Sequence, residues 1–284
     1  MRVLVVGAGG MVGRAVAEYC LTQKDDVIAC DHQTLDITDS ESVGVTLGRE
    51  RPEAVINCAA WTDVDACESD HQRAYAVNAH AVENLAVNSR RAGAVFVTIS
   101  TDYVFDGNKD GFYTQRDDPN PESVYGASKL EGERRAQAAS ARTVIVRTGW
   151  IFGPGGRNYL STIIERGRRG ESLKAISDAY GTPTYAADLA ARLRDLALLD
   201  VPGLFHVVNG GGGASYEEFT RAALKAAQCE HTDVQSVSMD TLDRPAPRPR
   251  NSRLRCLLSE AIGLRPLPNW EVALKEFAAS SSRI

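Results

Sequence analysis

The chain has no uninterrupted apolar segment of about 20 residues, the length that a helix needs to cross a bilayer. It also has no basic stretch followed by a short apolar core and a small-residue cleavage site, the arrangement of a secretory signal. These absences argue against a helical membrane anchor and against export. We therefore expect a cytoplasmic protein with no membrane partner.

An excess of positive charge is missing as well. The 32 Lys and Arg residues are outnumbered by 37 Asp and Glu residues, so the net charge is −5 and the pI is about 5.6. This balance argues against nucleic acid as the main partner. With 43% hydrophobic and 24% charged residues, the 284-residue chain has the composition of one large globular domain or two coupled ones.

Cysteine is scarce, and its spacing carries no metal or disulfide pattern. No two cysteines form a Cys-x-x-Cys pair, and several fall within predicted strands or helices. We interpret them as small buried hydrophobic residues in a reducing compartment, and we predict no metal site. The six are Cys20, Cys30, Cys58, Cys67, Cys229 and Cys256.

The first half of the chain alternates between two patterns. Short apolar runs predict buried strands, and longer segments between them predict helices. The predicted strands are 2–6, 27–30, 54–57, 94–99 and 143–147, and the predicted helices are 11–22, 40–50, 71–92 and 123–140. Alternation at this spacing indicates an α/β fold with a doubly wound parallel sheet that helices cover on both faces.

A glycine-rich loop follows the first predicted strand. Gly7, Gly10 and Gly13 give the spacing that allows a tight turn, a close approach of backbone to pyrophosphate, and packing of helix on strand. The free N–H groups of the following helix favour an anion there. An ordinary strand–turn–helix is the alternative interpretation. The residues that this loop predicts at a dinucleotide are Gly7, Gly10, Met11 and Val12.

An acidic residue ends the second predicted strand. Asp31 lies 24 residues after Gly7, about where a dinucleotide fold places a carboxylate on the adenosine ribose. A carboxylate there repels the extra phosphate of NADP, which favours NADH, although a protonated His32 would weaken the repulsion. A surface turn residue is the alternative interpretation of Asp31.

Tyr125 and Lys129 are four residues apart and therefore share one face of a predicted helix. A phenol ionises near pH 10, and a neighbouring ammonium favours the phenolate and lowers that pKa. Beside a dinucleotide loop, the pair predicts proton transfer coupled to hydride transfer. The alternative is a solvated surface contact worth a few tenths of a kcal/mol, about 0.2–0.5.

Several longer motifs support a family assignment. They are Leu-Asp-Ile-Thr-Asp at 35–39, Val-Ile-Asn-Cys-Ala-Ala-Trp-Thr-Asp-Val-Asp at 55–65, Ser-Thr-Asp-Tyr-Val-Phe-Asp-Gly at 100–107, Tyr-Gly-Ala-Ser-Lys-Leu-Glu-Gly-Glu at 125–133, and the segments 147–153, 180–190 and 248–254. Through them nearly the whole chain resembles the extended short-chain dehydrogenase/reductases, and among these the dTDP-4-dehydrorhamnose reductases. The run at 100–107 is the most specific motif.

The resemblance implies a Rossmann-type domain over 1–150, with a later return near 184–208. A smaller substrate-binding lobe would comprise 151–183 and 209–284. The implied activity is reduction of the C4 ketone of dTDP-4-dehydro-L-rhamnose by NAD(P)H. Thr101 would donate to the substrate carbonyl oxygen, Tyr125 would protonate it, and Lys129 would lower the tyrosine pKa and hold the nicotinamide ribose.

The resemblance also implies contact residues. Asp36 and Ile37 would lie near the adenine, and small residues would leave room for the nicotinamide half. Asn78 would lie near the active site, although a polar tie between helix and loop explains it equally well. The implied cofactor contacts are Asp31, His32, Asp36, Ile37, Ala59, Ala60, Thr62, Asn78, Tyr125 and Lys129, and the implied substrate contacts are Val64, Thr101, Tyr103, Trp150, Arg248, Asn251 and Arg253.

Two of these assignments have competing explanations from sequence. Trp150 is equally explained by core packing, although an aromatic face suits the apolar face of a deoxysugar. Residues 244–250, Arg-Pro-Ala-Pro-Arg-Pro-Arg, cannot lie inside a helix, and composition alone favours a linker. The resemblance instead places this segment in the substrate lobe, with arginine forks on the nucleotide diphosphate.

Two departures from the family pattern bear on cofactor and assembly. His32 stands where many relatives have an arginine that helps to accept NADPH, so NADH is expected and NADPH is the alternative. Ala15 stands where some relatives have a glutamate that bridges a dimer through magnesium, so no metal bridge is expected. The protein is expected to be a monomer or a homodimer.

Two other functions are alternatives. The first is a nucleotide-sugar epimerase or dehydratase, but dehydratases usually have two acidic residues after the triad threonine, and here Tyr103 follows Asp102. The second is a regulatory subunit that binds a cofactor and a partner enzyme without turnover. The intact Thr101, Tyr125 and Lys129 favour catalysis.

Overall fold

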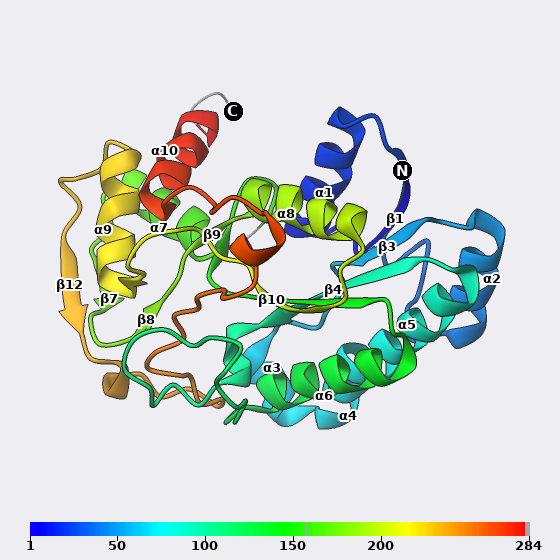
Figure 1. The fold of residues 1–284 in the computed structure, drawn as a ribbon. Helices are drawn as coiled ribbons and strands as arrows, with labels where there is room; N and C mark the ends of the chain where they lie inside the picture. The colour runs from blue at the N-terminus through cyan, green and yellow to red at the C-terminus, as the bar shows by residue number, and fades with distance from the viewer. Residues whose placement is uncertain (157, 282–284) are drawn as a thin grey trace.

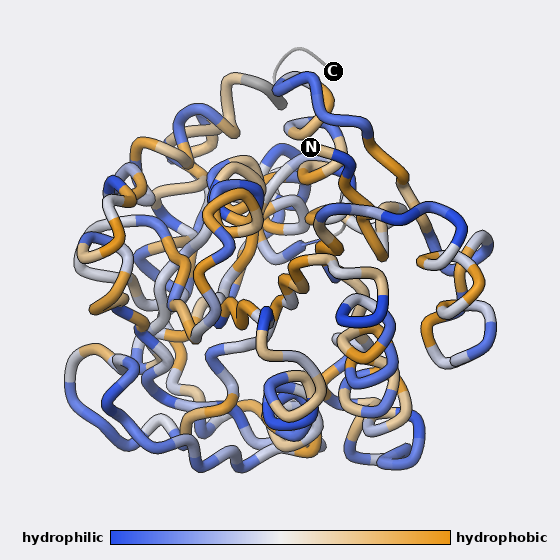
Figure 2. The backbone as a smooth tube through the Cα atoms, turned by 45° about the vertical axis from the view of Figure 1, so that its right-hand side comes forward, coloured by the Kyte–Doolittle hydropathy of each residue, from blue (hydrophilic) through white to orange (hydrophobic). Residues whose placement is uncertain are grey.

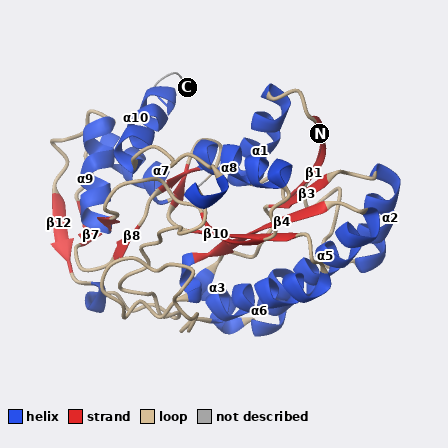
Figure 3. Ribbon diagram, in the orientation of Figure 1, coloured by secondary structure: helices blue, strands red, loops and turns tan. Residues whose placement is uncertain are grey.

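The computed structural model describes residues 1–156 and 158–281, and its centre is a parallel sheet of six strands (Figures 1 and 3). The strands are β1 (Arg2–Val6), β2 (Asp26–Cys30), β3 (Ala54–Asn57), β4 (Val95–Thr101), β5 (Thr143–Thr148) and β10 (Gly203–His206). Their order is β10-β5-β4-β3-β1-β2, and every neighbouring pair is parallel. The prediction of an α/β fold with a doubly wound sheet is confirmed.

Helices cover both faces of this sheet (Figure 1). One face carries α1 (Met11–Thr22) and α8 (Ala186–Leu199), and the other carries α2 (Ser40–Glu50), α5 (Ala81–Ala92) and α6 (Val124–Ala139). Alternate residues of β1 enter the two cores: Val3 and Val5 pack towards α1 and α8, whereas Leu4 packs with α2 and α5. The strand interiors are therefore mostly apolar, and Figure 2 shows hydrophobic segments gathered in the middle of the molecule.

The predicted helix over 71–92 is interrupted by a wider turn. The structure has α3 (Val64–Ser69), α4 (His71–Tyr75), the π-helix η1 (Ala76–His80) and then α5. Short π-helical insertions within helices are frequent at functional sites. The predicted helix 123–140 forms as α6, and the Ser123 hydroxyl caps it by accepting from the Gly126 N–H at 3.1 Å.

The remaining elements lie at one side of the sheet (Figure 1). Helices α7 (Tyr159–Arg168), α9 (Tyr216–Ala226) and α10 (Trp270–Ser281) share an aromatic core. Three two-stranded sheets join β7 (Leu173–Ile176) with β12 (Val234–Val237), β8 (Tyr180–Gly181) with β11 (Ala214–Ser215), and β6 (Ile151–Phe152) with β9 (Thr184–Tyr185). The short helices are η2 (Asp102–Val104), η3 (Met239–Thr241) and η4 (Glu260–Ile262). The predicted domain boundaries stay a prediction.

The interpretation of 244–250 as a linker is wrong, because the segment is packed against the first half of the chain. Ala246 is buried, and its N–H donates to the Asp65 carboxylate at 3.1 Å. Arg248 forms a two-pronged ion pair with the same carboxylate. The prolines thus stiffen a docked segment. All six cysteines are free, and four of them are buried.

We predict that Gly132→Ala lowers the free energy of unfolding by about 1–3 kcal/mol, because overpacking strains a close contact. An added Cβ at Gly132, inside α6, would lie 2.1 Å from the Asn78 carbonyl oxygen. Gly48→Ala is the matched control, since Gly48 also lies inside a helix but has nothing within 4 Å of an added Cβ. The control should stabilise by about 0.5–1 kcal/mol in urea denaturation. Equal effects of the two changes would contradict the close packing of α6 on η1.

Candidate active site

Two cavities lie end to end along the carboxyl edge of the sheet. Each has a volume of about 680 Å³, and both are lined by Gly9, Gly10 and the stretch 58–60 after β3. The chain winds outward in opposite directions from β1 and β3, so this edge is the switch point at which doubly wound folds bind ligands. Together the cavities form one long cleft, which suits an extended ligand.

The glycines of the loop are required by contact as well as by conformation. Gly7 has φ +76°, and a Cβ on it would lie 2.7 Å from the Ala59 nitrogen. A Cβ on Gly13 would lie 2.2 Å from the Gly7 carbonyl oxygen, so α1 could not approach β1. Gly10 is the N-cap of α1 and offers no capping side chain, which leaves the helix N–H groups for an anion. Met11 and Val12 line the second cavity.

The first cavity is lined by the predicted adenosine contacts Asp31, His32, Asp36 and Ile37. Asp31 Oδ1 accepts from the backbone N–H groups of Gln33 and Thr34 and from the Thr34 hydroxyl, each at 3.0 Å. The Thr34 hydrogen bonds are the main reason why the pKa of Asp31 is lowered. The carboxylate is thus charged and oriented. Within residues 1–156 and 158–281, Oδ2 has no hydrogen-bond partner.

The second cavity brings together all three residues of the predicted triad. Its lining also includes Thr62, Val64, Tyr103 and Trp150, which come from three separate segments of the chain. The predicted cofactor and sugar contacts therefore meet at one place. The three triad residues that line this cavity are Thr101, Tyr125 and Lys129.

Burial dominates the titration of Tyr125. Removal from water raises the pKa of this phenol well above 10, and the nearby charge of Asp102 raises it further, while a hydrogen bond with Thr101 works in the opposite direction. Burial thus outweighs the lowering effects in the free protein, and the expected lowering by Lys129 stays a prediction. The phenol keeps its proton at neutral pH, which is the state that a proton donor needs. The ring meets Tyr103 edge to face at 5.8 Å.

Lys129 is buried, and its ammonium donates to the Ile99 carbonyl oxygen at 2.7 Å. Burial lowers its pKa to about 8, although the neighbouring Glu133 carboxylate acts in the opposite direction. The ammonium is therefore held at the carboxyl end of β4, in the cavity that Tyr125 also lines.

Asp102 belongs to the site, although it was not among the predicted contacts. The Thr101 hydroxyl donates to Asp102 Oδ1 at 3.1 Å and accepts from the Tyr103 N–H at 3.1 Å. Burial raises the pKa of Asp102 to about 6. A Cβ on Gly149 would lie 2.4 Å from this carboxyl group, so only glycine fits there. Its place directly after Thr101 was the available signal.

Trp150 packs in the core, as one interpretation predicted, and it also lines the second cavity. Its ring stacks on Tyr216 with 3.8 Å between centroids, and it packs against the aromatic core of the second lobe while lining the second cavity. Its φ of +48° is unusual for a bulky residue and marks a strained position at the cavity wall. Tyr216 and Tyr159 also line the cavity, and no sequence motif indicated either of them.

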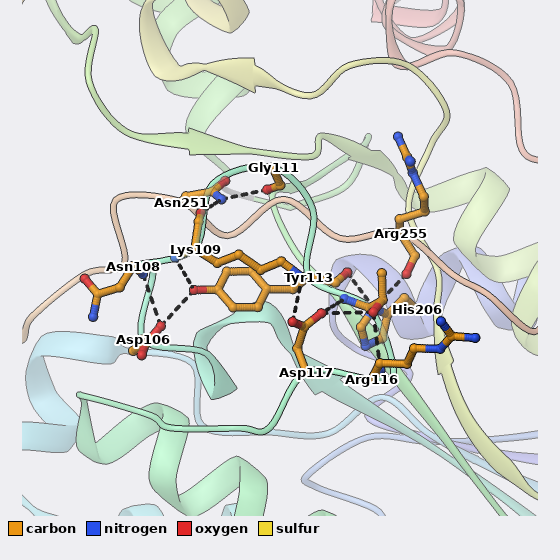
Figure 4. A network of polar contacts seen from close by, with 11 residues as sticks. Asp106, Asn108, Lys109, Gly111, Tyr113, Arg116, Asp117, His206, Asn251 and Arg255 are labelled. Atoms are coloured by element: carbon orange, nitrogen blue, oxygen red, sulfur yellow. Dashed lines mark hydrogen bonds and ion pairs between the residues drawn. The ribbon is translucent and has the colours of Figure 1, made fainter.

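The three residues predicted to contact the diphosphate, Arg248, Asn251 and Arg253, have different surroundings. Arg248 lies beside Trp150 and Tyr216 in a small cavity next to the cleft. Asn251 instead donates to the carbonyl oxygens of Lys109 and Gly111, at 2.5 and 2.7 Å (Figure 4). Its side-chain oxygen accepts from Arg253 Nε at 2.8 Å. The Arg253 guanidinium lies over the rings of Phe112 and Tyr180. Asn251 and Arg253 thus anchor the C-terminal segment.

Asn78 is a tie between elements. Its side chain accepts from the Trp61 N–H at 2.9 Å and donates to the Trp61 carbonyl oxygen at 3.0 Å and to the Ser128 hydroxyl at 3.1 Å. It is 1% exposed and therefore fully engaged inside the protein. The π-helical turn places it between the loop after β3 and α6. Asn78 therefore supports the wall of the cleft from the side that faces away from the cavity.

Comparison with known proteins assigns the chain to a family. The family described as RmlD substrate binding domain matches residues 1–283. A dTDP-4-dehydrorhamnose reductase of Streptomyces griseus is 36% identical over 281 residues, which cover 97% of this chain and 92% of that protein. The chain belongs to this family of reductases. Family membership confirms the predicted resemblance and the enzyme class, an oxidoreductase.

Solved structures of the reductase family have the same fold throughout. One from Clostridium acetobutylicum superposes with a TM-score of 0.95 at 36% identity, covering 99% of this chain and 100% of that one. One from Bacillus anthracis, solved in complex with NADP, has a TM-score of 0.94 at 34% identity and covers 98% and 99%. The fold of this chain is therefore the fold of these solved reductases over nearly their whole length.

Neither a metal cluster nor a membrane helix occurs in the part of the chain that the structure describes. Over 1–156 and 158–281, no three His, Cys, Asp or Glu side chains are placed to hold a metal ion together. Over the same residues, no helix is both long and apolar enough to cross a membrane. The expectation that no magnesium bridges a dimer of this reductase stays a prediction.

We predict that Asn78→Ala lowers the free energy of unfolding by about 2–4 kcal/mol, because three buried hydrogen bonds are lost and their partners stay unsatisfied. Asn88→Ala is the control, since Asn88 is also buried in this helical run but has only two side-chain hydrogen bonds, one donated to the Asn84 carbonyl oxygen and a long one of 3.4 Å accepted from Arg91. It should cost about 1 kcal/mol. Chemical denaturation measures both, and equal losses would contradict the tying role of Asn78.

Proposed function

We propose that this protein reduces the C4 ketone of dTDP-4-dehydro-L-rhamnose to give dTDP-L-rhamnose, with NADH preferred and NADPH as the alternative hydride source. The observation that carries the proposal is the meeting of Thr101, Tyr125 and Lys129 in the cavity that continues the glycine-rich cleft. The relatives named dTDP-4-dehydrorhamnose reductase support the choice of substrate.

The cleft fits a dinucleotide. Gly7 and Gly13 leave the backbone free of side chains at the pyrophosphate position, and Asp31 offers a charged oxygen to the adenosine ribose. Ala59 and Ala60 line both cavities, where small side chains leave room for the nicotinamide half. When bound, the nicotinamide supplies the hydride.

The protein groups divide the remaining work. Tyr125, kept neutral by burial, donates a proton to the ketone oxygen, and Thr101 donates a hydrogen bond to the same oxygen. Lys129 holds the ribose end of the cofactor and stays cationic below its pKa of about 8. The proton and the hydride then reach opposite ends of one carbonyl bond, and an alcohol results.

The sugar and nucleotide have separate contacts in this proposal. Val64, Tyr103, Trp150 and Tyr216 surround the sugar, and aromatic faces suit its apolar face. Arg248 is the diphosphate contact, and it would exchange its ion pair with Asp65 for phosphate oxygens. Asn251 and Arg253 remain diphosphate contacts in this proposal; in the free protein the Asn251 amide bonds to the Lys109 carbonyl oxygen, and Arg253 Nε bonds to Asn251 Oδ1.

The cellular setting follows from the same proposal. An enzyme that uses NADH and a nucleotide sugar works where both are made, so we place it in the cytoplasm. Its partner is then the dTDP-sugar, and it acts as a monomer or a homodimer. The half-buried and buried free cysteines suit a reducing compartment.

Tyr125→Phe is expected to lower kcat by about 10²–10⁴-fold, because the general acid is removed while the ring stays in place. Cofactor affinity should stay within about threefold of the wild type, a difference of less than 1 kcal/mol. Tyr19→Phe, a change in α1 outside the cleft, is the control and should keep full activity. Nicotinamide absorbance with enzymatically prepared dTDP-4-dehydro-L-rhamnose measures all three proteins. Undiminished turnover in Tyr125→Phe would refute the assigned acid.

Asp31→Ala is expected to narrow the preference for NADH over NADPH by about tenfold or more, which corresponds to at least 1.4 kcal/mol. Removal of the carboxylate ends its repulsion of the 2′-phosphate and also removes its hydrogen bond to the ribose. Asp26→Ala is the matched control, since Asp26 is an exposed carboxylate at the opposite end of β2. The ratio of kcat/KM for the two cofactors is the measurement. A ratio that is the same in both variants and the wild type would mean that Asp31 does not contact the ribose.

A further inference from the structure

Three residues of α6, each one helical turn from the next, face the carboxyl end of β4. Tyr125 forms a hydrogen bond with Thr101, Lys129 donates to the Ile99 carbonyl oxygen at 2.7 Å, and Glu133 accepts from the Ser100 hydroxyl at 2.5 Å. Consecutive residues of the strand thus hold the helix along one face. Glu133 is the one residue of this face to which the proposed reaction gives no task.

Glu133 is held by a buried arginine from the neighbouring strand β5. Arg147 Nε donates to Glu133 Oε1 at 2.8 Å, and Nη2 donates to Oε2 at 2.7 Å. Both side chains are only 4% exposed. The Phe105 ring lies against the guanidinium, 5.1 Å from Cζ to the ring centre. This two-pronged geometry occupies both carboxylate oxygens.

Without Arg147, the carboxylate would have another partner. Lys129 and Glu133 are four residues apart on one helix, a spacing at which lysine and glutamate commonly form ion pairs. In a buried site this attraction is much stronger than on a surface. Yet the Lys129 ammonium bonds to a backbone carbonyl oxygen, and Glu133 pairs with Arg147. The structure therefore shows the outcome of a competition for Glu133.

We propose that Arg147 is a positioning residue that withholds Glu133 from Lys129 and so keeps the ammonium in the cavity that it shares with Tyr125. The proposal rests on the proposed function in one respect, the task of Lys129 at the cofactor. The competition itself is independent of any substrate. The conformation of Lys129 is then set by β5, a strand to which it makes no bond of its own.

The titration midpoint of Lys129 depends on its charged neighbours and therefore reports how Glu133 is paired. Its charged and titratable neighbours are Glu133 on its own helix, Cys58 from the loop after β3, and Tyr125, which shares its cavity. Burial raises the pKa of the Cys58 thiol to about 12 and also raises the pKa of the Tyr125 phenol. Both groups are therefore uncharged at neutral pH. Glu133, with Arg147 beside it, is the charged neighbour that a substitution can alter.

Two substitutions should move the Lys129 titration in opposite directions. Arg147→Met leaves Glu133 unpaired, so its full charge should raise the titration midpoint of Lys129 by about one pH unit. Glu133→Gln leaves Arg147 unpaired, so the midpoint should fall by about one pH unit. In the double variant both charges are gone, and the midpoint should return to within about half a pH unit of the wild type. If the Arg147–Glu133 pair only stabilised the fold, the two substitutions would not move the Lys129 midpoint in opposite directions.

The experiment is a pH titration by NMR of full-length protein labelled with ¹³C-lysine. The chain has only six lysines, and Lys129→Met identifies the signal of Lys129. Arg135→Met is the control, because Arg135 forms a half-buried ion pair with Glu131 on the same helix and, among the residues that the structure describes, pairs with neither Lys129 nor Glu133. It should leave the Lys129 midpoint unchanged. Arg147→Lys, which keeps a cation next to Glu133, should also keep the midpoint near that of the wild type.

Turnover provides the second measurement. At pH 7, Arg147→Met should lower kcat about tenfold or more, and the double variant should recover part of this loss. Midpoints that move in the same direction, or a double variant that is slower than Arg147→Met, would overturn the proposal. If Arg147→Met does not fold, Glu133→Gln alone tests the proposal, and a Lys129 midpoint that rises or stays unchanged in that variant would overturn it. Opposite midpoint shifts without turnover of the dTDP-sugar would uphold this inference and refute the proposed function.

Discussion

The position of α6 on β4 is the constraint on which the active site depends. Thr101 contacts the first turn of this helix at Tyr125, Ile99 contacts the next turn at Lys129, and Ser100 contacts the turn after that at Glu133. These contacts are buried, where an unpaired polar group costs about 1–3 kcal/mol, so the helix has one favourable register along the strand. A displacement by one residue would separate the phenol, the ammonium and the hydroxyl at once. Close contact of Gly132 with the Asn78 carbonyl oxygen fixes the same helix from its other side.

Burial then gives the two titrating residues of the site opposite tendencies. Removal from water disfavours charge on either group, so the pKa of Tyr125 rises and that of Lys129 falls to about 8. The phenol therefore stays protonated at neutral pH, and the charge of the ammonium depends on its neighbours. Asp102, with a pKa raised to about 6 by burial, is a third group in this small volume. The cleft is apolar enough to perturb all three.

The second lobe closes the site with segments from the far end of the chain. The C-terminal segment is fixed by Asn251 and by backbone hydrogen bonds on both sides of Tyr113 (Figure 4). His206 Nδ1 faces the carbonyl oxygens of Tyr113 and Arg255, and burial lowers the pKa of this imidazole to about 3. A neutral ring at this junction avoids an unpaired charge beside Arg147. The Asp65–Arg248 pair joins the two lobes next to the cleft.

The sequence by itself determined the sheet and the glycine cradle, because these depend on local periodicity and on the short motif around Gly7, and its resemblance to the family predicted the triad of Thr101, Tyr125 and Lys129. It could not determine which partner each polar side chain takes. Lys129 was assigned to the phenol but bonds to Ile99, Asn251 was assigned to the ligand but holds Lys109 and Gly111, and Tyr216 had no signal at all. Only the tertiary structure decided these points, since partners 30 to 142 residues apart compete for each buried group and the compact fold selects among them.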